Sequence, residues 1–336
     1  MALYREEMQD ANIYKQTYLD GLEHLITQRQ EMLAEKRKQS AESLFSDQAD
    51  CRHALKKILG WPLVDCSNNP LPNVQATKLS DEDGYSVYRM QFEILDGFVL
   101  TGLYFRMNTE EKRPLVLVQH GGLGTPELIS GFYGSTHNYN QILERVIAQG
   151  VHAFAPQFLL WDKTYGIPFD RVRMDARLKR VGSSIAAVEL YCLVRILDYF
   201  ETQEEVRNFG MVGLSYGGFY TLFMAAIDTR IRSAISCAFF NTRDRVPWPD
   251  WTWFRVAEQF DDAEIACLVY PRKLCIEIAR DDDMFDFYHG VRAFEKLTEL
   301  CKDVGTDWVT FFPFDGVHEF CKDDAPIKEL AAHLLR

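Results

Sequence analysis

The chain has 336 residues, of which 47% are hydrophobic and 26% are charged. This balance is that of an ordinary globular protein with a substantial core, and it excludes wholesale disorder. The 37 Lys and Arg residues against 49 Asp and Glu residues give a net charge of −12. Such a surface repels phosphate groups, so we expect neither nucleic acid nor a membrane surface as a partner.

The cysteines and the N-terminus indicate a cellular location. Eight cysteines are scattered along the chain without a C-x-x-C spacing, which argues against a zinc knuckle and a disulfide framework. The first residues contain no basic stretch followed by an apolar one, and no window has the roughly 18 uncharged apolar residues that span a bilayer. The sequence therefore predicts a cytoplasmic protein with reduced thiols.

Residues 1–60 are predicted to form an N-terminal helical extension of one or two amphipathic helices. Apolar side chains recur there at helical spacing, at Tyr14, Tyr18, Leu22, Leu25, Ile26 and Leu33. This apolar stripe must be covered, so we expect the extension to cover the rim of a functional site or to pair two copies in a homo-oligomer. Residues 61–84 contain several prolines and are predicted to be a connector on the surface.

From residue 85 onward the pattern is that of a sheet covered by helices. Two alternating runs, 85–95 and 98–106, flank Asp96-Gly97 and predict an antiparallel hairpin. Short continuous apolar runs follow at 115–119, 151–155, 209–213, 234–239, 274–279 and 309–312, with helical stretches between them at 138–149, 183–200, 217–226, 287–300 and 327–335. Residues 85–336 are thus predicted to form one α/β domain with a doubly wound, mostly parallel sheet of eight strands.

One interval breaks this alternation. Residues 241–270, between the strands near 239 and 274, are rich in aromatic residues, including Trp248, Trp251 and Trp253. The length of this interval predicts a cap-like excursion over the carboxyl edge of the sheet, where such folds bind their ligands.

The sharpest motif is Gly213-Leu214-Ser215-Tyr216-Gly217, directly after one predicted strand and directly before a predicted helix. This is the G-x-S-x-G nucleophile elbow in the context that it requires. A serine in such a sharp turn needs neighbours without side chains, so that the helix can pass close to the strand. The motif predicts that Ser215 is a nucleophile.

A serine nucleophile needs a base, and in this chain order the base follows the serine. Three histidines do so. His289 and His333 lie in predicted helices, whereas His318 lies in the loop after the last predicted strand. Because loops at the carboxyl ends of strands carry catalysis in this architecture, His318 is the predicted base.

The remaining parts of such a site are an acid and two oxyanion donors. Four aspartates follow the strand at 274–279, and the sequence alone does not choose among Asp281, Asp282, Asp283 and Asp286; Asp244 is a weaker alternative. The oxyanion donors are predicted to be the backbone N–H groups of Tyr216 and of Gly122 or Leu123. His120, which begins that glycine-rich loop, is interpreted as a residue that shapes it.

Over residues 85–336 these motifs and their order resemble the α/β-hydrolase superfamily. The dienelactone-hydrolase-like and acetyl xylan esterase-like esterases are the most similar branch. That branch reads P-R-P-L and then G-x-x-D-x-x-F at this point, which implies that Asp282 is the acid. Here Lys273 replaces the second proline and Ala279 replaces the glycine. True dienelactone hydrolases use a cysteine nucleophile, whereas this elbow holds Ser215.

The predicted function is a serine esterase that cleaves a carboxylic ester of a small or medium substrate through an acyl-enzyme on Ser215. An acetylated sugar is one candidate, and no cofactor or metal is expected. The predicted substrate-binding residues are Leu123, Trp161, Trp248, Trp251 and Trp253. One alternative is a peptidase of the prolyl-oligopeptidase type, although residues 1–60 are too short and too helical for its β-rich gate. The other is a non-catalytic hydrolase-fold binding protein, which the complete Ser, Asp and His set disfavours.

Overall fold

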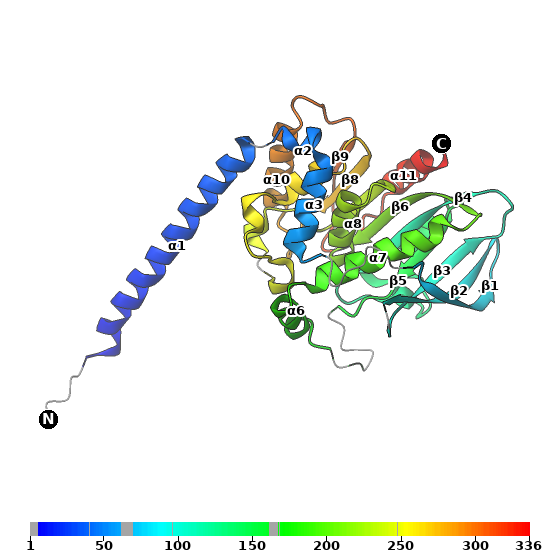
Figure 1. Ribbon diagram of the computed structural model, residues 1–336, viewed down its shortest axis with the longest axis horizontal. Coiled ribbons are helices and arrows are strands. Elements are labelled where there is room, and N and C mark those ends of the chain that lie inside the picture. Colours follow the sequence, from blue (N-terminus) through cyan, green and yellow to red (C-terminus); the bar gives the residue numbers. More distant parts are fainter. Residues whose placement is uncertain are drawn as a thin grey trace.

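The N-terminal extension consists of three helices. A computed structural model describes residues 6–39, 41–61, 70–95, 97–160, 167, 169–246 and 248–336. Helix α1 (Met8–Gln39) projects away from the rest of the molecule, and α2 (Ser43–Ser46) and α3 (Gln48–Leu59) lie against its body (Figure 1). Helix α3 ends at Gly60, whose φ of 89° is left-handed, a conformation that glycine adopts without a steric penalty.

A nine-stranded sheet forms the centre of the molecule, in the order β1-β2-β3-β5-β4-β6-β7-β8-β9. Strands β1 (Asn73–Asp81), β2 (Tyr85–Leu95) and β3 (Phe98–Met107) pair antiparallel, as do β3 and β5 (His152–Pro156). The other pairs are parallel and are formed by β4 (Arg113–Gln119), β6 (Val206–Leu214), β7 (Ile231–Cys237), β8 (Lys273–Ala279) and β9 (Val309–Phe314). The predicted hairpin and the mostly parallel, doubly wound sheet are confirmed.

The number of strands differs from the prediction. The sheet has nine strands rather than eight because residues 73–81, interpreted as part of a connector, form the edge strand β1. Seven of the nine residues of β1 are exposed, and the other two are half-buried. A strand that buries neither face carries no alternation of apolar and polar residues, so its sequence does not indicate a strand.

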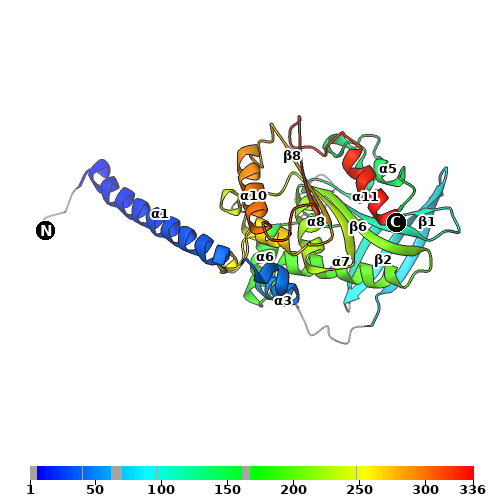
Figure 2. The ribbon, with the colours of Figure 1, turned by 90° about the horizontal axis from the view of Figure 1, so that it is seen from above.

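Helices cover both faces of the sheet, and each face has its own core (Figure 2). One core includes side chains of α3, α7 (Ile185–Glu201), α8 (Tyr216–Ile227), α9 (Asp262–Cys267) and α10 (Phe287–Leu300). The other includes side chains of α4 (Pro126–Ile129), α5 (Ile142–Ile147) and α11 (Ala325–Leu335). Helix α6 (Arg171–Arg180) was not predicted, because its sequence RVRMDARLKR lacks an apolar stripe.

The excursion at 241–270 is a chain of short helical turns. It contains η2 (Arg243–Arg245), η3 (Pro249–Trp251) and η4 (Val256–Glu258) before α9. Another short turn, η1 (His137–Tyr139), precedes α5, so the single helix expected at 138–149 is interrupted. Asn140 and Gln141 interrupt it with positive φ angles of 47° and 54°, which an α-helix does not accommodate.

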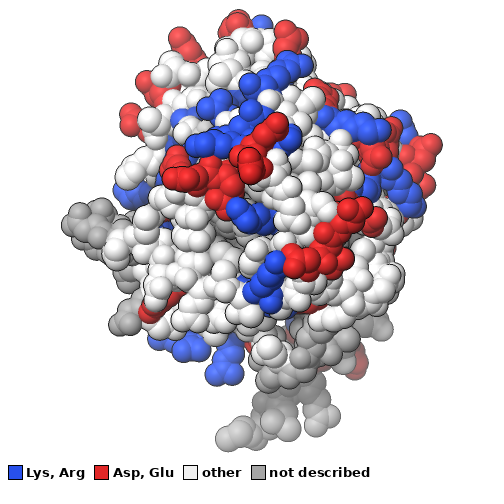
Figure 3. All heavy atoms as spheres, turned by 90° about the vertical axis from the view of Figure 1, so that its right-hand side faces the viewer, with Lys and Arg blue, Asp and Glu red and all other residues white. Residues whose placement is uncertain are grey.

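The surface carries charges of both signs. At the end of the molecule near β1 and β2, Lys and Arg side chains lie beside Asp and Glu side chains (Figure 3). Among the helices that the structure describes, none combines the length and the apolar character needed to cross a membrane.

Candidate active site

The predicted nucleophile lies in a strained turn between β6 and α8. Ser215 has a φ of 61°, which is uncommon for a residue with a side chain and typical of a nucleophile elbow. Its backbone N–H donates to the carbonyl of Cys237 over 2.9 Å. A Cβ atom on Gly213 would lie 2.4 Å from the Gly217 carbonyl, and one on Gly217 would lie 2.1 Å from the Gln119 carbonyl oxygen. Both glycines are therefore required for the approach of helix and strand.

The predicted base and one of the candidate acids form a hydrogen-bonded pair. His318 Nδ1 lies 2.9 Å from Asp282 Oδ2. The other carboxylate oxygen of Asp282 accepts the backbone N–H groups of Met284 (2.8 Å) and Phe285 (3.0 Å). The Phe285 ring stacks on the imidazole, with centroids 5.6 Å apart. Both rings and the buried carboxylate are thus held in one orientation.

The other candidate acids lie elsewhere. Asp281, Asp283 and Asp244 are exposed, and Asp286 caps α10 by accepting the His289 backbone N–H. The aspartate that contacts His318 is therefore Asp282, the residue that the resemblance implied to be the acid.

A cavity of about 420 Å³ joins most of the predicted site residues. Its lining includes Ser215, His318, Tyr216, Gly122, Leu123 and Trp248, which the sequence predicted, and also Tyr139 and Met284, which it did not. The structure therefore brings the serine after β6, the histidine after β9 and the loop after β4 to one cavity, at the carboxyl edge of the parallel strands.

The loop after β4 is shaped by His120 and Tyr139. The His120 imidazole is fully buried; its Nε2 accepts the Phe158 backbone N–H over 3.1 Å, and its Nδ1 lies 2.9 Å from the Gly121 carbonyl oxygen. The Tyr139 hydroxyl accepts the Gly121 N–H over 2.8 Å. Because that N–H is already engaged, Gly122 and Leu123 remain the candidates for the second oxyanion donor.

The tryptophans that were predicted to bind substrate lie in different surroundings. Trp248 lines the cavity and stacks on Tyr216 at 5.6 Å. Trp251 and Trp253 are only 0% and 5% exposed, pack against Phe219 of α8 and do not line the cavity. The prediction that these two contact a substrate there is wrong, because their rings fill the core beneath the excursion. Trp161 lies outside the described residues.

Sequence reasoning missed a buried ionic network behind Tyr216. The Arg171 guanidinium, which is 0% exposed, donates to Asp250 Oδ2 over 2.7 Å and to both oxygens of Glu189 over 2.9 Å. The Tyr216 hydroxyl donates to the same Asp250 oxygen over 2.9 Å. Burial by itself lowers the pKa of Arg171, but the adjacent Glu189 and Asp250 carboxylates raise that pKa above its ordinary value. The network thus holds a cation beneath the residue that follows the nucleophile.

A metal site is not evident in the part of the chain that the structure describes. There, no group of three or more His, Cys, Asp and Glu side chains could hold a metal ion.

Comparisons with known proteins identify the architecture. No protein-family model and no curated protein matches the chain, but solved structures do. A Bacteroides fragilis protein proposed to be an acetyl xylan esterase is 19% identical, with a TM-score of 0.66 over 82% of this chain and 76% of that one. The chain has the α/β-hydrolase fold.

Two further solved structures that match this chain are described as esterases. A glucuronoyl esterase from Solibacter usitatus is 14% identical, with a TM-score of 0.62 over 84% of this chain and 92% of that one. A cold-adapted esterase from an Arctic intertidal metagenomic library is 21% identical, with a TM-score of 0.54 over 78% and 99%. At these identities the likeness establishes the fold, and any function must be argued from the site itself.

Proposed function

We propose that this α/β-hydrolase is a serine esterase that forms an acyl-enzyme on Ser215. The observation that carries the proposal is the 2.9 Å pair of His318 and Asp282 on the cavity that Ser215 also lines. A nucleophile, a base and a group that orients the base are the parts that acyl transfer needs. The solved structures named above are described as esterases, which supports an ester as the substrate.

The proposed mechanism assigns one role to each group. Asp282 accepts the Nδ1–H of His318, so Nε2 is the basic nitrogen. Nε2 removes the Ser215 hydroxyl proton as the oxygen attacks the ester carbonyl. The backbone N–H groups of Tyr216 and Gly122 then stabilise the oxyanion, helped by the positive N-terminal end of α8. The alcohol leaves with the proton from His318, and a water molecule hydrolyses the acyl-enzyme by the same steps.

The cavity favours a small or medium ester. Its volume of about 420 Å³ lies in the lower part of the range of small-molecule sites, roughly 300–1,000 Å³. Leu123 and Met284 give it apolar walls, and the Trp248 ring offers a flat surface on which a sugar can stack. We therefore propose an acetylated carbohydrate as the first substrate to test. A cytoplasmic location remains a prediction from the sequence.

Hydrolysis of p-nitrophenyl acetate tests the proposal. Ser215→Ala and His318→Ala should each lower kcat/KM by roughly 10³-fold or more, without a change in the thermal unfolding midpoint. His289→Ala is the matched control, because His289 lies on α10 and does not line the cavity. Full activity in either of the first two variants would refute the assignment.

Labelling with a fluorophosphonate distinguishes the two alternatives. Wild-type protein that is labelled at Ser215 but cleaves peptides and not esters would be a peptidase. Protein that is not labelled at all would be a binding protein that has kept the fold.

A further inference from the structure

Helix α1 is anchored at its C-terminal end only. Among its residues, all of which the structure describes, Leu33 and Arg37 are buried. The Arg37 guanidinium donates to Glu264 Oε1 over 3.0 Å and to the Ala257 carbonyl oxygen. The preceding turns extend into solvent, away from the body (Figures 1 and 2). No residue of α1 lines the cavity of Ser215, so α1 does not cover the rim of that site within this chain.

The projecting part of α1 exposes an unusual amount of apolar surface. Nine large apolar side chains are between 43% and 75% exposed: Met8, Ile13, Tyr14, Tyr18, Leu19, Leu22, Leu25, Ile26 and Met32. At roughly 60–200 Å² for each fully exposed side chain, they present on the order of 700 Å². A stable protein interface buries about 800 Å² on each partner, so this helix offers nearly the whole area that a dimer needs.

The spacing of these residues suits a partner helix. Tyr18, Leu25 and Met32 are seven residues apart, and Leu22 lies four residues after Tyr18. This is the a/d spacing of a coiled-coil seam. An isolated helix is marginally stable in water, and helices in proteins are stabilised mainly by packing an apolar face. The seam therefore requires a covering surface of similar length and shape.

The charges along α1 indicate what that surface is. Its first half, residues 8–23, carries three acidic and one basic side chain, a net charge of −2; its second half, residues 24–39, carries two acidic and four basic side chains, a net charge of +2. Two copies that pair in parallel place like charges together. Two copies that pair antiparallel place each acidic half alongside a basic half, so long-range attraction favours this orientation over the parallel one.

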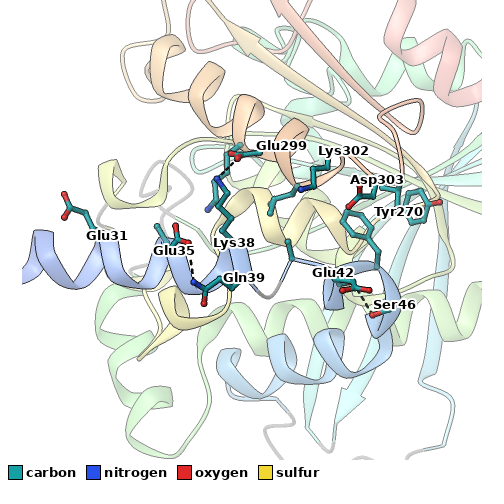
Figure 4. A pocket seen from close by; sticks show the side chains of 16 residues that line it. Glu31, Glu35, Lys38, Gln39, Glu42, Ser46, Tyr270, Glu299, Lys302 and Asp303 are labelled. Carbon is teal, nitrogen blue, oxygen red and sulfur yellow. Dashed lines mark hydrogen bonds and ion pairs between the residues drawn. The ribbon is translucent and has the colours of Figure 1, made fainter.

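A cavity of about 1070 Å³ lies between the C-terminal part of α1, α2 and α10 (Figure 4). Phe45, Tyr270 and Leu300 give it an apolar floor, and its wall carries three lysines and five carboxylates: Lys38, Lys296, Lys302, Glu31, Glu35, Glu42, Glu299 and Asp303. Because Lys38 is also paired with Glu299 over 2.6 Å, the cavity has no excess of positive charge for the acidic beginning of α1, and the pairing along α1 does not require it.

We infer that the protein is a homodimer in which the α1 helices of two copies pair antiparallel along the seam of Tyr18, Leu22, Leu25 and Met32. The pairing buries the apolar side of each helix and places its acidic half alongside the basic half of the other copy. This inference does not depend on the proposed enzymatic function.

Sedimentation equilibrium of the full chain at micromolar concentration tests the dimer. The wild type should show twice the chain mass of 38.9 kDa. Leu25→Glu, which places a carboxylate in the seam, should give a monomer with unchanged ester hydrolysis per chain. Thr27→Glu is the matched control, because it adds the same charge on the opposite side of the same turn, and it should remain a dimer. A monomeric wild type, or a dimer that survives Leu25→Glu, overturns the inference.

A charge reversal tests the orientation. The double variant Asp20→Lys/Glu23→Lys makes both halves of α1 basic. In an antiparallel pair these lysines lie alongside the basic half of the other copy, on the outer side of the helix, so long-range repulsion should raise the dissociation constant roughly threefold at low salt and not at high salt. In a parallel pair each reversed residue lies beside the same residue of the other copy. Like charges then meet both before and after the reversal, and the dissociation constant would hardly change. The latter result overturns the antiparallel arrangement.

Discussion

The buried cation Arg171 is a demanding feature of the core to replace. Its guanidinium is the charged partner of both Asp250 and Glu189, at 2.7 and 2.9 Å. In Arg171→Met both carboxylates would lose that partner and keep the hydroxyl hydrogen bonds from Tyr216 and Tyr220. Removing one partner of a buried ion pair costs about 3–5 kcal/mol, because the charge of the other partner stays buried without compensation. For a chain of this length, about 4 kcal/mol lowers Tm by roughly 6 °C.

Urea unfolding followed by circular dichroism measures this loss as a shift of the midpoint at constant slope. Arg255→Met is the control: Arg255 also forms a two-pronged ion pair, with Glu258, but its side chain is 64% exposed, so the midpoint should not move. The triple variant Arg171→Met/Glu189→Gln/Asp250→Asn removes the leftover charges and should recover half or more of the loss. A single variant that loses less than about 1 kcal/mol, or a triple variant no more stable than the single one, would refute the reasoning.

Three further predictions concern other parts of the molecule. Asp282→Asn should lower kcat for p-nitrophenyl acetate by roughly 10⁴-fold, because an amide cannot hold the histidine in the required tautomer. The control is Asp283→Asn, which changes the exposed neighbouring aspartate and should keep the wild-type kcat. Gly217→Ala should abolish the soluble, folded protein, since its Cβ would lie 2.1 Å from a backbone oxygen of β4; Gly21→Ala, with nothing within 4 Å of the new Cβ, should raise the urea midpoint slightly. Burial raises the pKa of Glu277 from 4.5 to about 7, so between these pH values the folded state binds more protons than the unfolded state and stability falls as pH rises. The stability of Glu277→Gln relative to the wild type should therefore increase as the pH rises from about 5 to about 8. Urea titrations at these two pH values measure the difference, and a pH-independent difference would contradict the reasoning.

Local sequence signals were sufficient wherever one short segment carries the whole structural requirement. The elbow at Ser215 was predictable because a strand, a sharp turn and a helix must follow each other within a few residues, and the two glycines are required by contacts of 2.1 and 2.4 Å. His318 was predictable because its loop directly follows a strongly apolar strand. Strand β1 was not, because an edge strand with exposed side chains leaves no pattern in the sequence.

The chain by itself therefore determined the succession of strands and helices, the turn that presents Ser215 and the loop that carries His318, since these follow from contacts between near neighbours. Only the tertiary structure decided which aspartate contacts His318. Asp281, Asp282 and Asp283 are the same residue type, but the side chain of Asp282 is buried against His318 whereas the other two are exposed. The tertiary structure also decided that Trp251 packs inward while Trp248 reaches the cavity, and that Arg171 meets Glu189 and Asp250. These outcomes depend on how separate elements pack together, and neither residue type nor spacing along the chain records that geometry.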